Sequence, residues 1–126
     1  RSMRLNQITI PSLNVEKSVA FYKKLGLQLI VEALPRYVRF ELPEGEATFS
    51  IHLVDELPKE NGTIIYFEEE GLDMLVESLQ TKGIVFTLLP TNQRWLWREA
   101  HLLDPDGNKI ILFFGGVNRK NPPWRI

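Results

Sequence analysis

The sequence predicts an α+β protein in which a β-α-β-β-β unit occurs twice, its strands forming curved mixed sheets around a cavity. Three observations favour this fold class. Strand-like alternation and helical spacing follow one another in the same order in both halves. Gly26 and Gly83, each where a helix would end, are 57 residues apart. Asp-Pro-Asp-Gly at 104–107 is a turn between two apolar runs, as in a β-hairpin.

The first unit begins with a strand at Met3–Ile10, which Pro11 is expected to end. Asn14 is a good N-cap, the apolar residues after it recur at near-helical spacing, and Gly26 suits the position after a helix. Polar turn signals then separate three further strands. These are predicted at Leu27–Ala33, Arg36–Leu42 and Ala47–Val54.

The second unit repeats the order. Thr63–Glu68 is the expected strand, and an apolar stripe from Leu72 to Leu79 predicts a helix that Gly83 closes. The acidic run 68–70 is read as a solvated segment leading into that helix. Three strands are predicted to follow, at Ile84–Leu89, Arg94–Leu103 and Lys109–Phe114. The tail 117–126 is predicted to be extended, because Pro122-Pro123 excludes helix.

Composition limits the function classes. The 126 residues suit a single domain, 1–126, with modules at about 4–55 and 62–115 and a tail at 116–126. The net charge is −1, and charges of both signs are dispersed along the sequence. This pattern does not indicate binding to nucleic acid or to an anionic membrane. No apolar run approaches the roughly 18 residues that span a bilayer. The absence of cysteine excludes disulfides and thiolate metal sites, and we expect a cytoplasmic protein.

Each predicted strand separates into two faces, because successive side chains point to opposite sides. One set of faces is uniformly apolar and can be covered by the helices. The other set mixes aromatic and polar side chains, as small-molecule pockets do, if the sheets curl. The alternative is a solvated sheet face. The mixed face carries Gln7, Thr9, Tyr37, Arg39, Glu41, Ser50, His52, Tyr66, Glu99 and His101.

Two tryptophans fall near the mixed face of the second unit. In a strand at Arg94–Leu103, Trp95 and Trp97 would share a face with Glu99 and His101. Aromatic walls beside a carboxylate suit a flat or cationic ligand, whereas packing in the core is the alternative. Glu41 and Glu99 are candidates for acid–base work only if both face the cavity.

Two segments resemble the vicinal oxygen chelate superfamily, which includes glyoxalase I, bleomycin resistance proteins, fosfomycin resistance proteins and extradiol dioxygenases. VEKSVAFYKKLGLQLIVE (15–32) is similar to the family's first helix, and LLDPDGNKIILF (102–113) to its closing hairpin. Gly71-Leu72-Asp73 matches the second helix more loosely. The resemblance covers roughly residues 4–115. It implies this fold, a small-molecule ligand and a homodimer, while function varies widely on the scaffold.

The resemblance also implies where metal-dependent members would hold a metal ion. The first ligand position falls on Gln7 and the second on His52. The third falls on Thr63 or Ile64, and the fourth on Ile111, where the family pattern carries a glutamate. Because a divalent ion wants three or more suitable protein ligands, we expect no metal and no other cofactor.

Two function hypotheses remain. The first is a binding protein of the bleomycin-resistance type that sequesters an aromatic or cationic compound, with no catalytic residue assigned. The second is a metal-dependent lyase, isomerase or dioxygenase that uses Gln7 and His52 with Glu99 or His101 to hold Zn, Ni, Fe or Mn. The ligand-binding residues predicted for the first are Gln7, Tyr37, Arg39, His52, Trp97, Glu99 and His101.

Overall fold

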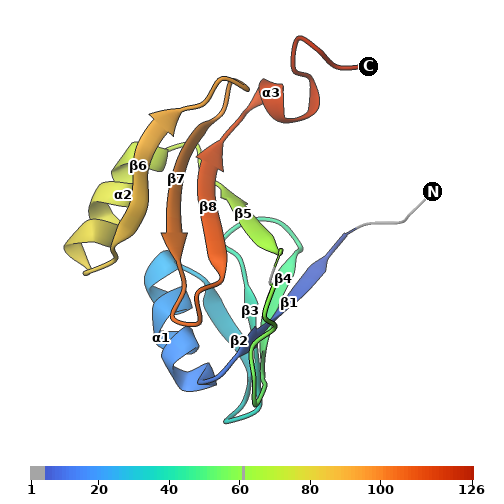
Figure 1. The fold of residues 1–126 in the computed structure, drawn as a ribbon, viewed down its shortest axis with the longest axis vertical. Coiled ribbons are helices and arrows are strands. Elements are labelled where there is room, and N and C mark those ends of the chain that lie inside the picture. Colours follow the sequence, from blue (N-terminus) through green and yellow to red (C-terminus); the bar gives the residue numbers. More distant parts are fainter. Residues whose placement is uncertain (1–4, 61) are drawn as a thin grey trace. The chain divides into compact units, whose positions relative to one another are not determined.

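The computed structural model describes residues 5–60 and 62–126, which divide into two compact units with the boundary between residues 61 and 62. Each unit holds one four-stranded mixed sheet and one long helix (Figure 1). The order of elements is β-α-β-β-β in both, so the predicted duplication is confirmed. None of the helices within the described residues is both long and apolar enough to cross a lipid bilayer.

The first unit contains a sheet of order β1-β4-β3-β2, in which β1 and β4 are parallel and the other neighbours antiparallel. Its helix packs on one face of the sheet, against β2, β3 and β4. The elements are β1 (Gln7–Ser12), α1 (Val15–Leu25), β2 (Gln28–Ala33), β3 (Tyr37–Glu41) and β4 (Thr48–Leu53).

Local sequence signals fix the ends of α1. The Asn14 side chain accepts a hydrogen bond from the Lys17 backbone N–H at 3.1 Å, as an N-cap does. Gly26 ends the helix with φ of 104°, a left-handed conformation that glycine adopts without strain. Tyr22 on this helix is fully buried, and its ring contacts the rings of Phe40 and Phe49 on the sheet. The helix therefore covers the apolar face, as predicted.

The second unit contains a sheet of order β5-β8-β7-β6, again with one parallel pair, β5 and β8. Its long helix packs against β6, β7 and β8 and buries Leu72, Val76 and Leu79. The elements are β5 (Ile64–Glu68), α2 (Leu72–Thr81), β6 (Phe86–Asn92), β7 (Arg98–Leu103), β8 (Lys109–Phe114) and α3 (Val117–Lys120).

The first strand was predicted to end before Pro11, and this needed correction. The strand β1 continues through Pro11 to Ser12 instead of ending there. A proline is tolerated because β1 is an edge strand. One side of β1 pairs with no other strand, so the N–H that proline lacks is not needed for a hydrogen bond on that side. Part of the predicted strand, Met3 and the residue after it, lies outside the described residues, and β1 begins at Gln7.

The β6–β7 connection differs more from the prediction. The strand β6 is shifted to Phe86–Asn92 and passes through Pro90, and β7 begins at Arg98 instead of Arg94. Residues 93–97 form a turn in which the Gln93 N–H donates to the Trp97 carbonyl at 2.7 Å. Leu96 has φ of 70°, which interrupts strand alternation. Trp95 and Trp97 are therefore turn residues.

The C-terminal segment was predicted to be extended, and this was wrong for its first part. Residues Val117–Lys120 form the short helix α3, and Pro122-Pro123 follow it. The two prolines exclude helix only where they stand, so the residues before them remain able to complete one turn. Trp124 lies beyond this turn with 57 % of its surface exposed.

The closing turn of the second unit is held by Asp104. Its Oδ1 accepts hydrogen bonds from the backbone N–H of Asp106 at 2.9 Å and of Asn108 at 2.8 Å. Its Oδ2 accepts from Asn108 Nδ2 at 2.8 Å, and Gly107 supplies a φ of 81°. Both Asp104 and Asn108 are buried. The turn signal is thus structural, and it sets the register of β7 and β8.

We predict that Asp104→Ala lowers the free energy of unfolding by about 1–3 kcal/mol, because it leaves buried N–H donors without an acceptor. Urea unfolding followed by circular dichroism measures the change. Glu44→Ala is the matched control, since Glu44 is an exposed acidic residue in a turn of the first unit. Equal effects of the two substitutions would contradict the role of Asp104.

Candidate functional site

The strand register brings several chemically active side chains to one face of the second sheet. His101 on β7 lies opposite Ile111 on β8, which in turn neighbours Tyr66 on β5. Two residues along the same strands, Glu99 on β7 lies opposite Phe113 on β8. Directly paired residues point to the same side of a sheet, so these five share a face. It is the face that alternation assigned to Glu99 and His101.

Glu99 is the polar centre of this face. Its carboxylate is almost fully enclosed, with 1 % of the residue exposed. Trp95 Nε1 donates a hydrogen bond to Oε2 at 2.8 Å, and His101 Nε2 lies 2.8 Å from Oε1. A buried carboxylate needs such partners, because leaving it unpaired is costly. Glu99 therefore acts on its surroundings through Trp95 and His101, which keep 38 % (whole residue) and 20 % (side chain) exposure.

Three aromatic rings lie beside this centre. Trp97 stacks on Phe113 with ring centroids 4.6 Å apart and planes inclined by 26°. Tyr66 meets both rings edge-on, at 6.0 Å from Trp97 and 5.5 Å from Phe113. Offset stacking and edge-to-face contacts are the favourable arrangements of aromatic rings. Tyr66 keeps 47 % of its surface exposed, so the cluster is open to solvent on this side.

The C-terminal segment fixes the position of Trp97. Trp97 Nε1 donates to the Asn118 carbonyl at 3.2 Å, and the ring lies so close to Gly115 that no side chain fits there. Glu68 anchors the same segment by accepting from the N–H groups of Gly115 at 2.9 Å and Gly116 at 3.0 Å. Glu68 is exposed, as the prediction of a solvated acidic run expected, and its carboxylate in addition holds the chain that supports Trp97.

The predicted ligand residues of the first unit lie on one face of its sheet. The register pairs Tyr37 with His52 and Arg39 with Ser50. Arg39 Nε donates to the Tyr37 hydroxyl at 2.9 Å, and the guanidinium carbon lies 5.5 Å from the Tyr37 ring centroid. Ser50 also shares a 2.6 Å hydrogen bond with Thr9. Tyr37, Arg39 and Ser50 thus form one connected polar group.

The phenol of Tyr37 is tuned by these neighbours. Desolvation is the largest single influence and raises its pKa. Hydrogen bonds with Ser50 and Arg39, together with the Arg39 charge, outweigh it and hold the Tyr37 pKa below the usual phenol value. The effect favours a hydroxyl that gives up its proton more readily than a free tyrosine.

Gln7 and His52 stand at the margins of this polar group. The Thr48 hydroxyl donates to Gln7 Oε1 at 2.7 Å, so the amide oxygen already has a partner. His52 is exposed at the end of β4, between Pro11 and Tyr37 in the register. The predicted ligand residues therefore form two groups, one in each unit, with Gln7, Tyr37, Arg39 and His52 in the first and Trp97, Glu99 and His101 in the second.

Within residues 5–60 and 62–126, no group of three His, Cys, Asp or Glu side chains is placed to hold a metal ion. Ile111 occupies the position directly opposite His101, where the resemblance would place a glutamate. Glu99 and His101, the predicted substitute ligands, are hydrogen-bonded to each other. The donor set on this face therefore fits a metal poorly.

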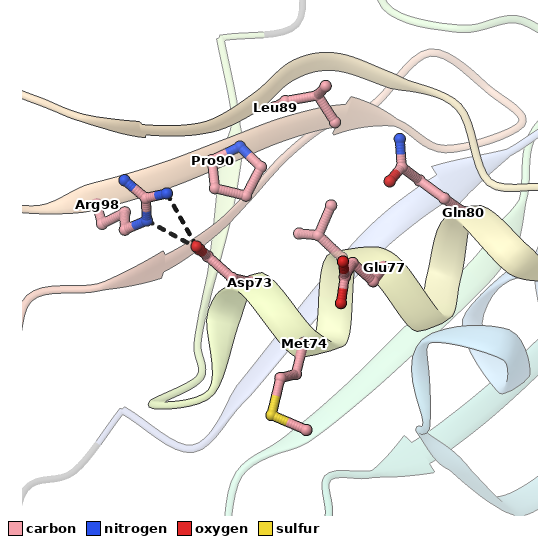
Figure 2. A pocket seen from close by; sticks show the side chains of 8 residues that line it. Asp73, Met74, Glu77, Gln80, Leu89, Pro90 and Arg98 are labelled. Atoms are coloured by element: carbon pink, nitrogen blue, oxygen red, sulfur yellow. Dashed lines mark hydrogen bonds and ion pairs between the residues drawn. The ribbon is translucent and has the colours of Figure 1, made fainter.

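A groove lies on the helix side of the second unit. It is shallow, with a volume of about 270 Å³, and separates α2 from the β6–β7 hairpin, as Figure 2 shows. Across it, Arg98 forms a bidentate pair with Asp73, Nε to Oδ1 at 2.8 Å and Nη2 to Oδ2 at 2.9 Å. Sequence reasoning missed this groove, because the pair joins residues from two elements. Its lining is Asp73, Met74, Val76, Glu77, Gln80, Leu89, Pro90 and Arg98.

The Asp73–Arg98 pair shifts the pKa values of both groups. The hydrogen bonds from Arg98, followed by its charge, hold the Asp73 pKa below the usual aspartate range despite some desolvation. The same hydrogen bonds raise the Arg98 pKa. The Arg98 and Asp73 side chains keep 38 % and 60 % of their surface exposed, so salt screens the pair. Its role is to fasten α2 to the start of β7.

The two sheets, each in a β-α-β-β-β unit, define a duplicated α+β fold. The sequence model of the Glyoxalase/Bleomycin resistance protein/Dioxygenase superfamily matches residues 4–112. The chain belongs to this superfamily, as its resemblance to glyoxalases and bleomycin resistance proteins implied. No curated protein matches the sequence.

Solved structures share the fold. A superfamily member from Sphaerobacter thermophilus has 24 % identity and a TM-score of 0.72, covering 89 % of this chain and 97 % of that one. A bleomycin-binding protein complexed with bleomycin has 19 % identity and a TM-score of 0.74, covering 91 % and 100 %. A bleomycin resistance determinant encoded on the transposon Tn5 has 19 % identity and a TM-score of 0.75, covering 90 % and 98 %. These likenesses show the fold alone.

We predict that Gly115→Ala displaces Trp97, because the new Cβ would lie 2.8 Å from Nε1 and 2.9 Å from Cδ1. The expected cost is about 1–3 kcal/mol of stability, with a changed near-ultraviolet circular dichroism spectrum as the stack on Phe113 is lost. Gly62→Ala is the matched control, since nothing lies within 4 Å of its added Cβ. An unchanged spectrum for Gly115→Ala would contradict the close contact.

We predict that the contribution of the Asp73–Arg98 pair to stability is lost in acid. Because the Asp73 pKa is depressed in the folded state, the contribution is present above the unfolded pKa and disappears as pH falls through the folded value. The stability difference between the wild type and Asp73→Asn should therefore shrink as pH falls from about 5 to about 2. Glu77→Gln is the control, and the same pH trend for both would contradict the assignment.

Proposed function

We propose that this protein binds a small organic molecule carrying an aromatic ring or a cationic group, and that it does so without a metal ion. The observation that carries the proposal is the face of the second sheet. There an open aromatic cluster of Tyr66, Trp97 and Phe113 adjoins Trp95 and His101, both oriented by the buried Glu99 carboxylate.

The chemistry of the face selects the ligand class. A flat aromatic group gains stacking energy of about 0.5–1.5 kcal/mol per ring contact beyond its buried area. A cation over an exposed ring gains a similar amount, and more where water is excluded. The negative charge of Glu99 adds to the attraction, although the carboxylate is too enclosed for direct contact. The Trp95 and Tyr66 rings are the surfaces such a ligand would meet first.

The polar group of the first unit is part of the same proposal. Tyr37 and Arg39 present a phenol and a guanidinium joined by a hydrogen bond, and exposed His52 adds an imidazole beside them. Gln7 offers its amide N–H donors, since its oxygen accepts from Thr48. In the proposal, these side chains contact the polar parts of the ligand.

Relatives suggest the first probe. One protein of this fold is complexed with bleomycin, and another is a bleomycin resistance determinant. Bleomycin is a large molecule with flat heteroaromatic parts and cationic groups, which matches the class inferred from the aromatic face. Sequestration of such a compound is therefore the proposed role in the cell.

The metal-dependent alternative is less well supported by the donor set. Gln7 Oε1 and His101 Nε2 each already have a partner, and both Glu99 oxygens accept hydrogen bonds. An ion bound there would have to replace these contacts, with Ile111 contributing no ligand.

For the protein as a whole, the proposal includes a cytoplasmic homodimer, whose oligomeric state sedimentation equilibrium would measure.

We predict that bleomycin, or berberine as a flat aromatic cation, quenches tryptophan fluorescence and binds the wild type. Trp97→Ala and Tyr66→Ala should each weaken binding by up to roughly tenfold, since one stacking contact is worth about 0.5–1.5 kcal/mol. Trp124→Ala is the matched control, because Trp124 lies in the C-terminal tail with 57 % exposure. Isothermal calorimetry gives the affinities, and absence of binding for both compounds would sink the proposal.

A thermal-shift series separates the metal hypothesis from this one. Purified protein is titrated with Zn²⁺, Ni²⁺, Fe²⁺ and Mn²⁺, and its metal content is measured. The proposal expects no stabilisation by these ions. A stabilisation in the wild type that disappears in His52→Ala would replace the metal-free proposal with the metal-dependent one.

A further inference from the structure

Two segments that are separate in the sequence lie side by side at one end of the second sheet. One contains the turn between β6 and β7, and the other follows β8 and contains α3 (Figure 1). Trp97 joins them, because its Nε1 donates to the Asn118 carbonyl at 3.2 Å and its ring packs against Gly115. We call these two segments, residues 93–98 and 115–126, the basic tip.

The basic tip differs in composition from the rest of the chain. It carries five basic and no acidic residues, and it holds all three tryptophans of the protein. The net charge of the whole chain is −1, so this concentration of positive charge does not appear in the overall composition. The basic residues of the tip are Arg94, Arg98, Arg119, Lys120 and Arg125.

Three of the five positive charges are not neutralised by the protein. Two are paired with carboxylates of the second unit, those of Arg98 and Arg119. Within the part of the chain that the structure describes, no Asp or Glu side chain forms an ion pair with Arg94, Lys120 or Arg125. All three of these residues are exposed. The basic tip therefore presents uncompensated positive charge to its surroundings.

Exposed apolar side chains accompany these charges. Leu96 in the turn keeps 48 % of its surface exposed, Val117 at the start of α3 keeps 70 %, and Trp124 keeps 57 %. None of the three lines the groove beside α2. They stand on a turn and on a chain segment, so each presents a separate apolar anchor. Such anchors suit a fluid partner that can close around each of them.

We propose that the basic tip binds the surface of an anionic lipid bilayer. Trp124 lies at the level of the lipid headgroups, where the amphipathic indole ring is favoured. Leu96 and Val117 enter the boundary between headgroups and acyl chains, and the three uncompensated cations are attracted by the negative surface potential. Apolar anchors and basic residues are each weak alone, and together they give attachment that is stable and reversible.

Charge complementarity decides which lipids are bound. A neutral bilayer offers only the apolar contacts, whereas an anionic bilayer also attracts each uncompensated basic residue. The inference goes beyond small-molecule binding and does not depend on it. The two properties are compatible, because an aromatic cation is attracted to the same negative lipids. A protein attached there would meet its proposed ligand where that ligand concentrates.

Co-sedimentation with vesicles tests the charges. We expect the wild type to bind vesicles of equal parts phosphatidylserine and phosphatidylcholine, and to bind phosphatidylcholine alone much more weakly. The double variant Arg94→Gln/Lys120→Gln should bind the anionic vesicles about 25-fold more weakly, since one basic residue near such a surface contributes roughly fivefold. Wild-type binding that does not depend on phosphatidylserine would overturn the proposal.

The matched control removes the same charge from the first unit. Lys23→Gln/Lys24→Gln replaces two exposed basic residues in the last turn of α1, outside the basic tip. It should keep the wild-type affinity for anionic vesicles. An equal loss in the two double variants would show that net charge alone governs the attraction, and the assignment to the basic tip would be wrong. Circular dichroism confirms that each variant is folded.

Brominated lipids test the apolar contact. Bromine on the acyl chains of phosphatidylcholine, mixed with phosphatidylserine, should quench the tryptophan fluorescence of the wild type. Vesicles of the same composition without bromine are the control. Trp124→Phe keeps an aromatic ring at this position and removes the fluorophore, so most of the quenching should disappear. Quenching that is absent in the wild type, or unchanged in Trp124→Phe, would contradict insertion of the tip.

An acidic protein is the other partner that a basic surface could attract, and poly-glutamate represents it. Calorimetry measures binding of poly-glutamate to the wild type and to Arg94→Gln/Lys120→Gln. If the wild type binds poly-glutamate in a way that needs these two residues, and does not bind vesicles, the partner is an acidic polypeptide and the membrane proposal fails. If it binds neither, the basic tip has no such role. Both outcomes leave the small-molecule function untouched, because that is measured without lipid.

Discussion

The enclosed carboxylate of Glu99 is the constraint on which the candidate face of the second unit depends. A charge removed from water is tolerated only when hydrogen bonds replace its hydration. Trp95 and His101 supply them, one to each oxygen. Trp95 comes from the turn at 93–97, in which Leu96 adopts φ of 70°. A local backbone irregularity is thus stabilised by a buried polar contact.

A second carboxylate supports the aromatic half of the face. Glu68 ends β5 and accepts from the N–H groups of Gly115 and Gly116, which would otherwise lack partners where β8 ends and α3 begins. The chain held in this way passes against Trp97 and accepts its indole N–H at Asn118. The position of the aromatic cluster therefore depends on the C-terminal segment, although none of that segment lies in the sheet.

The sequence was sufficient where signals are local. The cap at Asn14, the left-handed Gly26 and the Asp104 turn were predicted because each depends on residues a few positions away. The turn at 93–97 was missed because polar and apolar residues alternate in RWLWRE as they do in a strand. No local sequence signal indicates a positive φ at Leu96. Glu99 and His101 were placed on one face by strand periodicity. Their contact with each other and with Trp95 is tertiary, so only coordinates reveal it. Their roles in ligand binding stay predictions.

Ile111 links the fold to the chemistry proposed for it. It lies directly opposite His101 and beside Tyr66, in the place where a glutamate would serve a metal-dependent relative. A carboxylate there would put a second negative charge next to the imidazole and give it a competing acceptor. The isoleucine leaves Glu99 as the hydrogen-bond partner of His101 and keeps this part of the face apolar. The residue that weakens a metal site therefore also leaves the Glu99–His101 hydrogen bond without a competing acceptor at position 111.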